Sequence, residues 1–287
     1  MERERGRGAS RGRHGGRQAG ARERAPGAPQ DRVGGDTSSL ISAWSSSDAT
    51  CSTVLPDRTS PLAGTSADRA ERNGLILRPG YLDRAAQEVL LGVIREIIRE
   101  APLYTPRMPK TGKPMSVRMT NCGPLGWMTD EAGYRYQPTH PETGRPWPPI
   151  PDILMRAWAD LAGHPHPPEA CLINYYGAEA RMGLHQDRDE QDFGAPVVSL
   201  SLGDTGLFRV GGTRRGDPTR SFRLASGDAV MLAGSARLAF HGIDRIIAGT
   251  STLLPEGGRI NLTLRCVTRV ADAARSGAGK VIPLSFG

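Results

Sequence analysis

The amino-acid sequence predicts an α+β protein whose strands form a double-stranded β-helix, or jelly roll. Apolar residues first recur at helical spacing, and after residue 169 short apolar strands alternate with turns. Helices followed by strands are typical of the α+β class. Several short strands at this spacing favour a sandwich or barrel, and a jelly roll is the form that we predict.

The first 73 residues differ in composition from the rest of the chain. They are rich in Gly, Arg, Ser, Pro and Ala and lack apolar periodicity. Such a segment buries too little apolar surface to offset the entropy lost on ordering, so residues 1–73 are predicted to be a disordered extension. Nine arginines against four acidic residues give residues 1–32 a net charge of +5, out of +7 for the whole chain. This extension is either a solvated tail or a weak nucleic-acid-binding arm.

A single domain is predicted over residues 74–287, and its first elements are helical. It begins with a short strand at Gly74–Leu77. Leu82–Glu100 then carries apolar residues at helical spacing, and a second helix is predicted over Pro151–Ala162, with proline in its first turn. The segment between them, Tyr104–Trp147, is dense in proline, glycine and aromatic residues, which indicates an ordered cover.

The second part of the domain, residues 169–268, is predicted to be the jelly-roll core. Turn sequences such as Gly203-Asp204 and Ser226-Gly227-Asp228 separate its apolar runs. The predicted strands are Ala170–Tyr176, Val197–Leu202, Leu207–Val210, Ser221–Leu224, Ala229–Leu232 and Arg259–Val267.

Cysteine spacing and hydropathy exclude several classes of protein. Cys51, Cys122, Cys171 and Cys266 lie far apart and form no CxxC pair, which argues against a zinc ribbon or a disulfide scaffold. Their pattern favours a reducing, cytoplasmic compartment. We expect no membrane partner, because the apolar runs are too short to span a bilayer and an N-terminal apolar signal is absent.

A candidate metal site is formed by His185, Asp187 and His241. His185 and Asp187 are two residues apart, so on an extended strand both side chains leave the same face. Two imidazoles and one carboxylate make the facial triad that holds a non-haem Fe(II) and leaves open positions on the metal. A His-x-Asp pair alone is more often a surface or capping arrangement, so both interpretations are open from the spacing.

A strand with a polar face accompanies this candidate site. Alternation within residues 259–265 places polar side chains on one face and apolar side chains on the other. The polar face consists of Arg259, Asn261, Thr263 and Arg265. It lies either in water, on an edge strand, or along a polar cavity. In the second case its guanidinium groups suit a cosubstrate with carboxylates.

Several motifs in these segments resemble the AlkB family of Fe(II)/2-oxoglutarate-dependent dioxygenases, and its bacterial members most closely. The resemblance runs from about Leu75 to Thr268. The core motifs are Leu172-Ile173-Asn174-Tyr175-Tyr176, His185-Gln186-Asp187, His241-Gly242 and Arg259-x-Asn261-x-Thr263-x-Arg265. The upstream motifs are Met115-Ser116-Val117, Thr120-Asn121-Cys122-Gly123, Leu125-Gly126-Trp127 and Arg145-Pro146-Trp147.

The resemblance implies an iron site and a cosubstrate site. Fe(II) would be held by His185, Asp187 and His241. The 2-oxoglutarate contacts would be Asn174, Tyr176, Arg259, Asn261 and Arg265. Arg259 would pair with the distal carboxylate, and Arg265 would lie near the end bound to iron. Molecular oxygen would complete the reactants.

The resemblance also implies a nucleotide-recognition cover within residues 74–168. Trp127 would stack on a target base, with Tyr134 and Tyr136 as further aromatic contacts of the cover. Asp189 would favour a cationic base, although a solvated acid is the alternative interpretation. Arg215 would contact the substrate, an assignment that Arg214 beside it leaves open by one position.

The activity implied by the resemblance is DNA repair. An N-methyl group of 1-methyladenine or 3-methylcytosine would be hydroxylated, with release of formaldehyde, succinate and carbon dioxide. The base must be unstacked to be reached, so alkylated single-stranded DNA is the expected partner. The protein is expected to be a monomer. The same reaction on RNA, tRNA or a protein is the runner-up, followed by a nucleic-acid-binding jelly roll without turnover.

Overall fold

The computed structural model describes residues 70–268. The predicted disordered extension lies outside these residues, apart from the strand β1 (Ala70–Arg72). β1 pairs antiparallel with β2 (Leu75–Arg78) through Asn73 and Gly74, whose φ angles are 47° and 85°. Two consecutive positive φ angles are typical of a two-residue hairpin turn. Regular structure therefore begins before the predicted start at Gly74.

Seven antiparallel strands form the larger sheet, in the order β1-β2-β11-β8-β13-β6-β3. Its remaining strands are β3 (Val117–Cys122), β6 (Ala170–Tyr176), β8 (Val197–Gly203), β11 (Ala229–Leu232) and β13 (Arg259–Arg265). β13 lies between β8 and β6 and pairs with both. The polar strand is therefore central, and the alternative of an edge strand is excluded.

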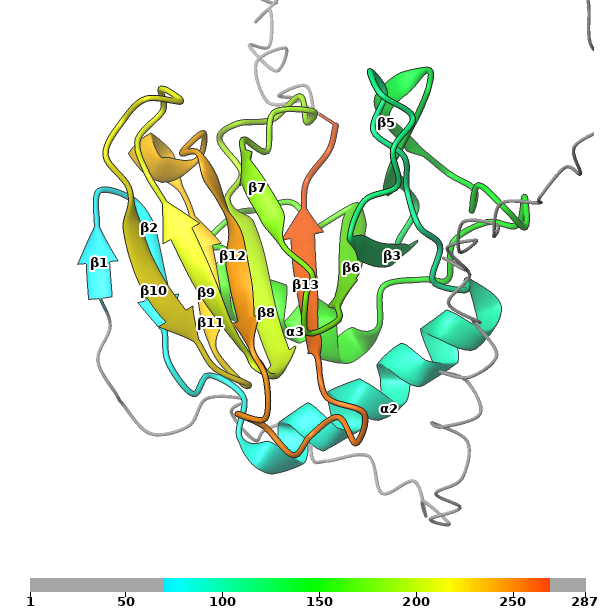
Figure 1. Ribbon diagram of the computed structural model, residues 1–287, viewed down its shortest axis with the longest axis horizontal. Coiled ribbons are helices and arrows are strands. Elements are labelled where there is room, and N and C mark those ends of the chain that lie inside the picture. Colours follow the sequence, from blue (N-terminus) through cyan, green and yellow to red (C-terminus); the bar gives the residue numbers. More distant parts are fainter. Residues whose placement is uncertain (1–69, 269–287) are drawn as a thin grey trace, which may run out of the picture. The chain divides into compact units, whose positions relative to one another are not determined.

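Four strands form the smaller sheet, in the order β10-β9-β12-β7. They are β7 (Met182–His185), β9 (Thr205–Val210), β10 (Arg220–Leu224) and β12 (His241–Ile247), visible in Figure 1. β7 and β12 were not predicted as strands. β7 has only four residues, and a register shift between Ile243 and Arg245 breaks the alternation of β12. The two antiparallel sheets confirm the jelly roll.

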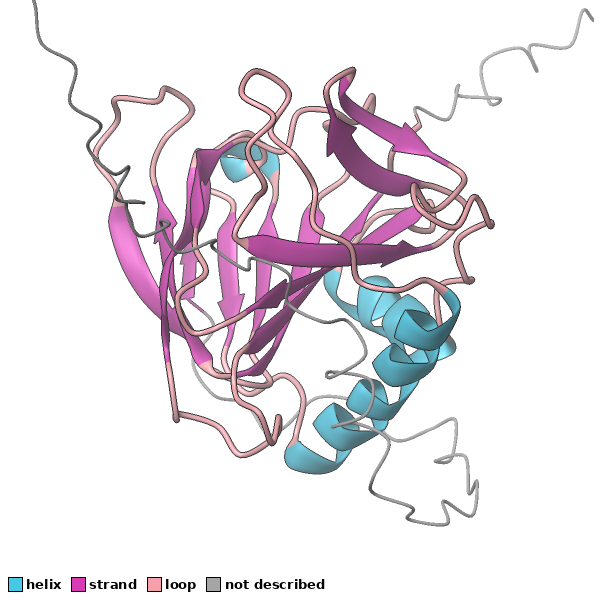
Figure 2. Cartoon of the chain, turned by 45° about the vertical axis from the view of Figure 1, so that its right-hand side comes forward, coloured by secondary structure: helices cyan, strands magenta, loops and turns pink. Residues whose placement is uncertain are grey.

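Two helices cover the larger sheet (Figure 2). α2 (Arg84–Glu100) begins after Asp83, whose carboxylate accepts a hydrogen bond of 2.8 Å from the backbone N–H of Ala86. This N-cap satisfies one of the amides that a helix start leaves unpaired. α3 (Asp152–Leu161) follows Pro151, and a short 3-10 helix η1 (Gly234–Ala236) precedes β12. Within residues 70–268, no helix is both long and apolar enough to cross a membrane.

The two faces of the larger sheet pack against different partners. One face joins α2 and α3 in an apolar core that includes Leu90, Leu154 and Leu262. The other face joins the smaller sheet, where Phe208 and Val230 belong to a second cluster. The jelly roll therefore holds its site on one face of a sheet that the helices support from behind.

The segment between the helices contains a β-hairpin that the sequence did not resolve into strands. β4 (Gly126–Asp130) pairs antiparallel with β5 (Gly133–Gln137). The side chain of Asn121 at the end of β3 holds β4 in place, because it donates to the carbonyl and accepts from the N–H of Trp127. The predicted cover is thus an ordered hairpin attached to the larger sheet.

Shortening a buried side chain on the central strand β13 should destabilise the protein strongly. Leu262 is fully buried, so Leu262→Ala should lower the free energy of unfolding by about 2–5 kcal/mol. Urea denaturation followed by circular dichroism measures this change. Val89→Ala is the matched control, since Val89 is 50% exposed on α2 and should change stability by at most about 0.5 kcal/mol. Equal effects of the two substitutions would contradict this account of the core.

Candidate metal and cosubstrate site

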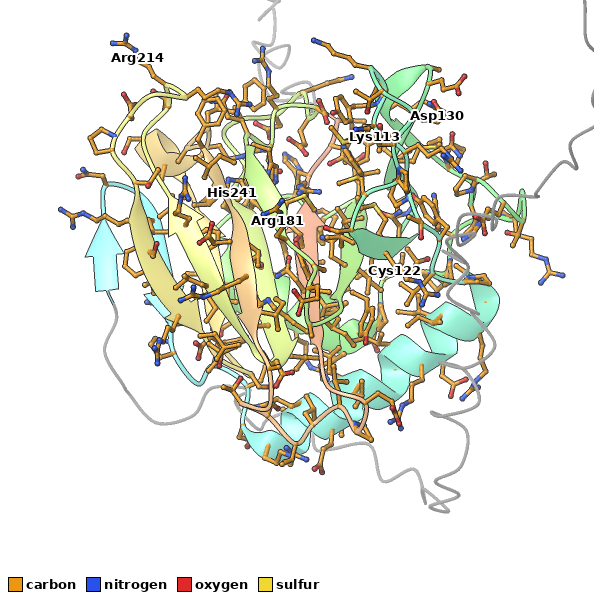
Figure 3. All side chains as sticks on the ribbon, in the orientation of Figure 1. Lys113, Cys122, Asp130, Arg181, Arg214 and His241 are labelled. Atoms are coloured by element: carbon orange, nitrogen blue, oxygen red, sulfur yellow. The ribbon has the colours of Figure 1, made fainter. Side chains whose placement is uncertain are left out.

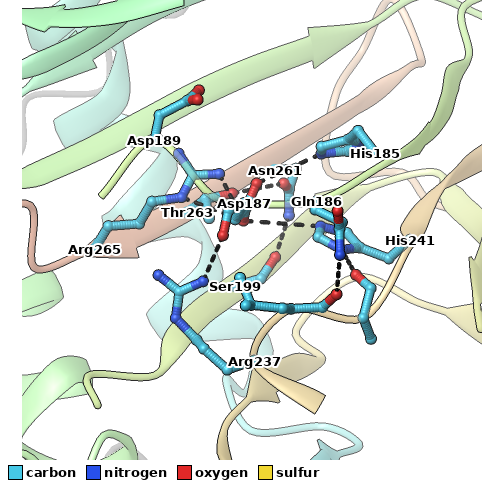
Figure 4. Close-up of polar contacts among 12 residues, drawn as sticks. His185, Gln186, Asp187, Asp189, Ser199, Arg237, His241, Asn261, Thr263 and Arg265 are labelled. Carbon is cyan, nitrogen blue, oxygen red and sulfur yellow. Dashed lines mark hydrogen bonds and ion pairs between the residues drawn. The ribbon is translucent and has the colours of Figure 1, made fainter. Parts of the chain in front are cut away.

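His185, Asp187 and His241 converge on one point in the jelly roll (Figure 4). His185 ends β7, His241 begins β12, and the two are cross-strand partners. The Nε2 atoms of His185 and His241 lie 3.6 and 3.8 Å from the two carboxylate oxygens of Asp187. The three ligand atoms lie within 4.8 Å of one another, close enough to hold one metal ion. Asp187 follows the end of β7. His185 and Asp187 therefore belong to one site, but they do not lie on one strand as their spacing suggested.

Backbone carbonyls orient both imidazoles. Nδ1 of His185 lies 3.0 Å from the carbonyl oxygen of Gly183, and Nδ1 of His241 lies 2.9 Å from that of Ala239. A carbonyl only accepts hydrogen bonds, so Nδ1 carries the proton and Nε2 presents a lone pair to a metal. Burial, followed by the nearby His185, lowers the pKa of His241 to about 4, which keeps this ligand neutral at pH 7.

Asp187 is a buried carboxylate that the protein keeps charged. Burial opposes its ionisation, but Arg265 and then the two histidines hold its pKa well below the usual range. Nη2 of Arg265 donates to Oδ2 of Asp187 at 2.9 Å, and Nε donates to the same oxygen at 3.3 Å. A charge-assisted pair of this kind offsets the cost of removing a carboxylate from water.

Two buried residues that sequence analysis missed, Arg237 and Glu190, hold the loop after β7. Arg237 donates to the carbonyl of Asp187 at 2.7 Å, to that of Ala195 at 2.8 Å and to Glu190 at 3.2 Å. Glu190 also lies 3.4 Å from Nε of Arg265. Figure 4 shows Arg237 and Arg265 approaching Asp187 from different directions. A lone arginine in the turn Ser-Ala-Arg-Leu-Ala carries no local signal of this role.

The polar face of β13 lines the cavity, which is one of the two interpretations that its alternation left open. Arg259 lies opposite Tyr176 of β6, and Asn261 lies opposite Asn174. These four side chains border a cavity of about 1050 Å³ that the metal triad also lines. The side-chain oxygen of Asn174 is buried there without a hydrogen-bond partner. The five predicted cosubstrate residues, with Arg265 as the fifth, thus meet in one cavity.

Arg259 fits a carboxylate ligand. Its guanidinium is fully buried and donates to the hydroxyl of Ser201 at 2.8 Å and to the carbonyl of Leu224 at 3.4 Å, both neutral acceptors. Its Nε has no partner, and burial lowers its pKa to about 10. A Cβ at Gly206 would lie 2.9 Å from Nε, so glycine at this position makes room for the guanidinium. A carboxylate would supply the missing acceptor and countercharge.

Aromatic side chains of the cover border the same cavity. The rings of Trp127 and Tyr134 are stacked, with centroids 5.7 Å apart and an interplanar angle of 22°. Nε1 of Trp127 donates to the Asp189 carboxylate at 2.8 Å. All three residues line the cavity, and Tyr134 is 51% exposed at its edge. This hydrogen bond joins the cover to the loop after β7.

The two remaining predicted substrate residues have different surroundings. Arg215 lines the cavity, whereas its neighbour Arg214 does not. Arg215 donates to the carbonyl of Leu184 at 3.2 Å, and its guanidinium carbon lies 4.8 Å from the ring centroid of Phe240. Tyr136 does not line the cavity and instead donates a hydrogen bond to Glu190.

A family model described as the 2OG-Fe(II) oxygenase superfamily matches residues 74–265. This is the class that the jelly roll and its His-Asp-His site define: oxygenases that use Fe(II), 2-oxoglutarate and O2. The alpha-ketoglutarate-dependent dioxygenase AlkB homolog of Caulobacter vibrioides is 56% identical over 192 residues, 67% of this chain and 87% of that protein. Escherichia coli AlkB is 43% identical over 185 residues, 63% of this chain and 84% of that protein.

The chain therefore belongs to the AlkB family of alpha-ketoglutarate-dependent dioxygenases. The solved structure of OsALKBH1 supports the fold assignment, with a TM-score of 0.61 and 30% sequence identity. That match covers 69% of this chain and 99% of the other. The resemblance that the sequence motifs carried is thus confirmed, and so is the dioxygenase class that it implied.

The surroundings of Arg259 predict that stability and cosubstrate binding can be separated. Arg259→Met should weaken 2-oxoglutarate binding roughly 100-fold or more, because charge-assisted hydrogen bonds are lost. It should leave the free energy of unfolding unchanged or raise it, because a buried charge with neutral partners is replaced by an apolar side chain. Calorimetric titration of the Fe(II)-loaded protein without oxygen, together with urea denaturation, tests both parts. Arg156→Met, on the exposed surface of α3, is the matched control. If Arg259→Met binds 2-oxoglutarate as tightly as the unsubstituted chain, Arg259 is not the residue that binds the distal carboxylate.

Proposed function

We propose that the chain is a DNA repair dioxygenase that removes methyl groups from N-alkylated bases such as 1-methyladenine and 3-methylcytosine. One observation carries the proposal: Trp127 and Asp189 line the cavity that contains the His-Asp-His site. An aromatic face beside a carboxylate suits a flat cation. Methylation at a ring nitrogen makes both bases cationic, so they match this environment better than unmodified bases do.

In this proposal, His185, Asp187 and His241 are the ligands of Fe(II). Once bound, the metal supplies, with 2-oxoglutarate and O2, the oxidising chemistry that hydroxylates the methyl carbon of the base. The protein contributes two imidazole Nε2 ligands and one carboxylate, which leave open positions for the cosubstrates. Arg265 keeps Asp187 ionised, and Arg237 fixes the backbone at Asp187.

The 2-oxoglutarate site is assigned to the polar residues of β6 and β13. Arg259 would bind the distal carboxylate, which supplies an acceptor for its unpartnered Nε. Arg265 would lie towards the end of the cosubstrate at the metal, since it already contacts Asp187. Asn174, Tyr176 and Asn261 would complete the polar contacts across the paired strands.

The base would lie against Trp127, with the carboxylate of Asp189 near its positive charge. Tyr134 and Arg215 line the same cavity and would contact the nucleotide. Tyr136 would act through Glu190, to which it donates a hydrogen bond. Once the methyl group carries a hydroxyl, the carbon–nitrogen bond breaks and releases formaldehyde. Succinate and carbon dioxide are the products of the cosubstrate.

Single-stranded DNA is the proposed substrate. A methyl group inside a base stack cannot reach a buried metal, so the base must be unpaired or flipped out, and this costs least in a single strand. A relative from Arabidopsis thaliana, 32% identical over 224 residues, is named DNA N(6)-methyladenine demethylase ALKBH1C, which supports DNA as the nucleic acid. The same reaction on RNA or tRNA is the runner-up.

The protein is proposed to act as a monomer in the cytoplasm. Cys122, Cys171 and Cys266 are buried free thiols, which suits a reducing compartment. Gel filtration with light scattering tests the oligomeric state, and a dimer at micromolar concentration would refute it.

The reaction is tested on a 1-methyladenine oligonucleotide with Fe(II), 2-oxoglutarate, ascorbate and O2. The intact chain should yield adenine and equal amounts of succinate and formaldehyde. Asp187→Asn should reduce this turnover at least roughly 100-fold, because a metal ligand and the partner of Arg265 are both weakened. Mass spectrometry of the oligonucleotide measures repair, and metal analysis measures iron content. Equal product with the intact chain and the variant would rule out the proposed activity.

Two further measurements separate the alternatives. Competition between methylated DNA and methylated RNA of the same sequence compares the kcat/KM values and identifies the preferred nucleic acid. Failure to bind iron, with affinity for DNA retained, would instead favour a binding protein without turnover.

Asp189 predicts selectivity for cationic lesions. Asp189→Asn should lower kcat/KM for 1-methyladenine roughly 10- to 100-fold, since a hydrogen bond or contact with a charged group contributes about 1.5–3 kcal/mol. It should change kcat/KM much less for 1-methylguanine, whose ring is neutral. Glu179→Gln, which neutralises an exposed carboxylate elsewhere, is the matched control. Equal losses on both lesions would mean that Asp189 supports the cover rather than recognising charge.

A further inference from the structure

We propose that the outer face of the smaller sheet binds the phosphate backbone of the nucleic acid beside the base that enters the cavity. This surface, the arginine face, consists of Arg209, Arg223 and Arg245 on three adjacent strands. The inference rests on the proposed nucleic-acid substrate and adds a second contact surface outside the cavity.

Strand register places the three arginines together. On β9, Leu207 lies opposite Arg223 of β10 on one side and opposite Arg245 of β12 on the other. Arg209 is two residues from Leu207 on the same strand, so its side chain leaves the same face. Phe208, between them, is buried in the core between the sheets, which identifies the arginine side as the outer one. Arg223 and Arg245 are exposed.

Little negative charge balances this surface. Arg209 lies 3.3 Å from the Asp244 carboxylate, and both side chains are partly exposed, at 40% and 46%. Within residues 70–268, neither Arg223 nor Arg245 forms an ion pair. The three arginines are diagonal to one another or one strand apart, so their like charges repel. An anionic partner would offset that repulsion.

The arginine face continues from the mouth of the cavity. β9 and β10 are joined by residues 211–219, which carry Arg214 and Arg215. Arg215 lines the cavity, and Figure 3 shows Arg214 on this connecting loop. Arg209 pairs with Ser221, the second cross-strand pair counted from this loop. A nucleic-acid strand whose base passes Arg215 can therefore follow the hairpin onto the arginine face.

Phosphate is the group that this arrangement fits. Guanidinium groups bind phosphate oxygens in a planar, two-pronged geometry, and contacts with phosphates position a strand without reading its sequence. The position beside the cavity mouth favours nucleic acid over an anionic lipid surface or an acidic protein. The arginine face would then raise affinity for long substrates without altering chemistry at the metal.

The test compares salt dependence of binding. Arg223→Gln with Arg245→Gln removes the two unpaired arginines and leaves the Arg209–Asp244 pair intact. For an unmodified 20-nucleotide DNA strand, the plot of log affinity against log salt should become shallower by about 1.4, the effect of two lost phosphate contacts. Affinity at 0.1 M salt should fall roughly 10- to 30-fold. Fluorescence anisotropy of the full chain measures both quantities.

The matched control is Arg84→Gln with Arg156→Gln, which makes the same charge change at exposed positions on α2 and α3. This control should keep the salt slope of the unsubstituted chain. Equal slopes for the two double variants would overturn the arginine face, as would a loss of affinity for phosphatidylserine vesicles but not for DNA.

A methylated trinucleotide separates the two proposals, because it fills the cavity but is too short to cover the hairpin. The double variant should demethylate it at the rate of the unsubstituted chain and should show a raised KM only with the 20-nucleotide substrate. A KM that rises equally for both substrates would contradict the arginine face. If the unsubstituted chain does not demethylate the trinucleotide, the proposed function is overturned. The salt slopes test the arginine face alone, because they measure binding and not the reaction.

Discussion

The site depends on keeping one carboxylate, that of Asp187, ionised inside the protein. A buried carboxylate without a partner would take up a proton and lose its value as a metal ligand. Arg265 prevents this through two hydrogen bonds to Oδ2, while Arg237 holds the backbone carbonyl of the same residue. The negative charge is thus fixed in position before any metal binds, and the imidazoles of His185 and His241 complete the ligand set.

The requirement for Arg265 ties the metal site to β13 and hence to the cosubstrate site. β13 lies at the centre of the larger sheet, where its polar face borders the cavity and its apolar face packs against the helices. Arg259 and Arg265 stand six residues apart on this strand. At about 3.3 Å per residue their α-carbons are separated by roughly 20 Å, and long side chains can converge from there on one dicarboxylate. One rigid strand therefore sets the distance between the metal and the distal anchor.

Local pattern revealed the polar face of β13 and the candidate ligands, because alternation and His-x-Asp spacing are properties of short segments. The same reasoning placed both helices and the strand β6. It missed β7 and β12, since the first has four residues and the second contains a register shift. It also missed Arg237, whose contact with Asp187 spans fifty residues of sequence. Features that arise only from tertiary contact left no periodic signal, and the family resemblance supplied roles that pattern alone left open.

The two ends of the cavity differ in how firmly they are held. At the metal end, Asp187, Glu190, Arg237 and Arg265 form a buried ionic network. At the cover end, the links to this loop are two hydrogen bonds, from Trp127 to Asp189 and from Tyr136 to Glu190, and Tyr134 is half exposed. Since Asp189 and Asp187 share the loop after β7, the firm network positions the acid against which the cover rests. A base entering beside Trp127 must share that carboxylate with the indole, so charge recognition and the position of the cover depend on the same atoms.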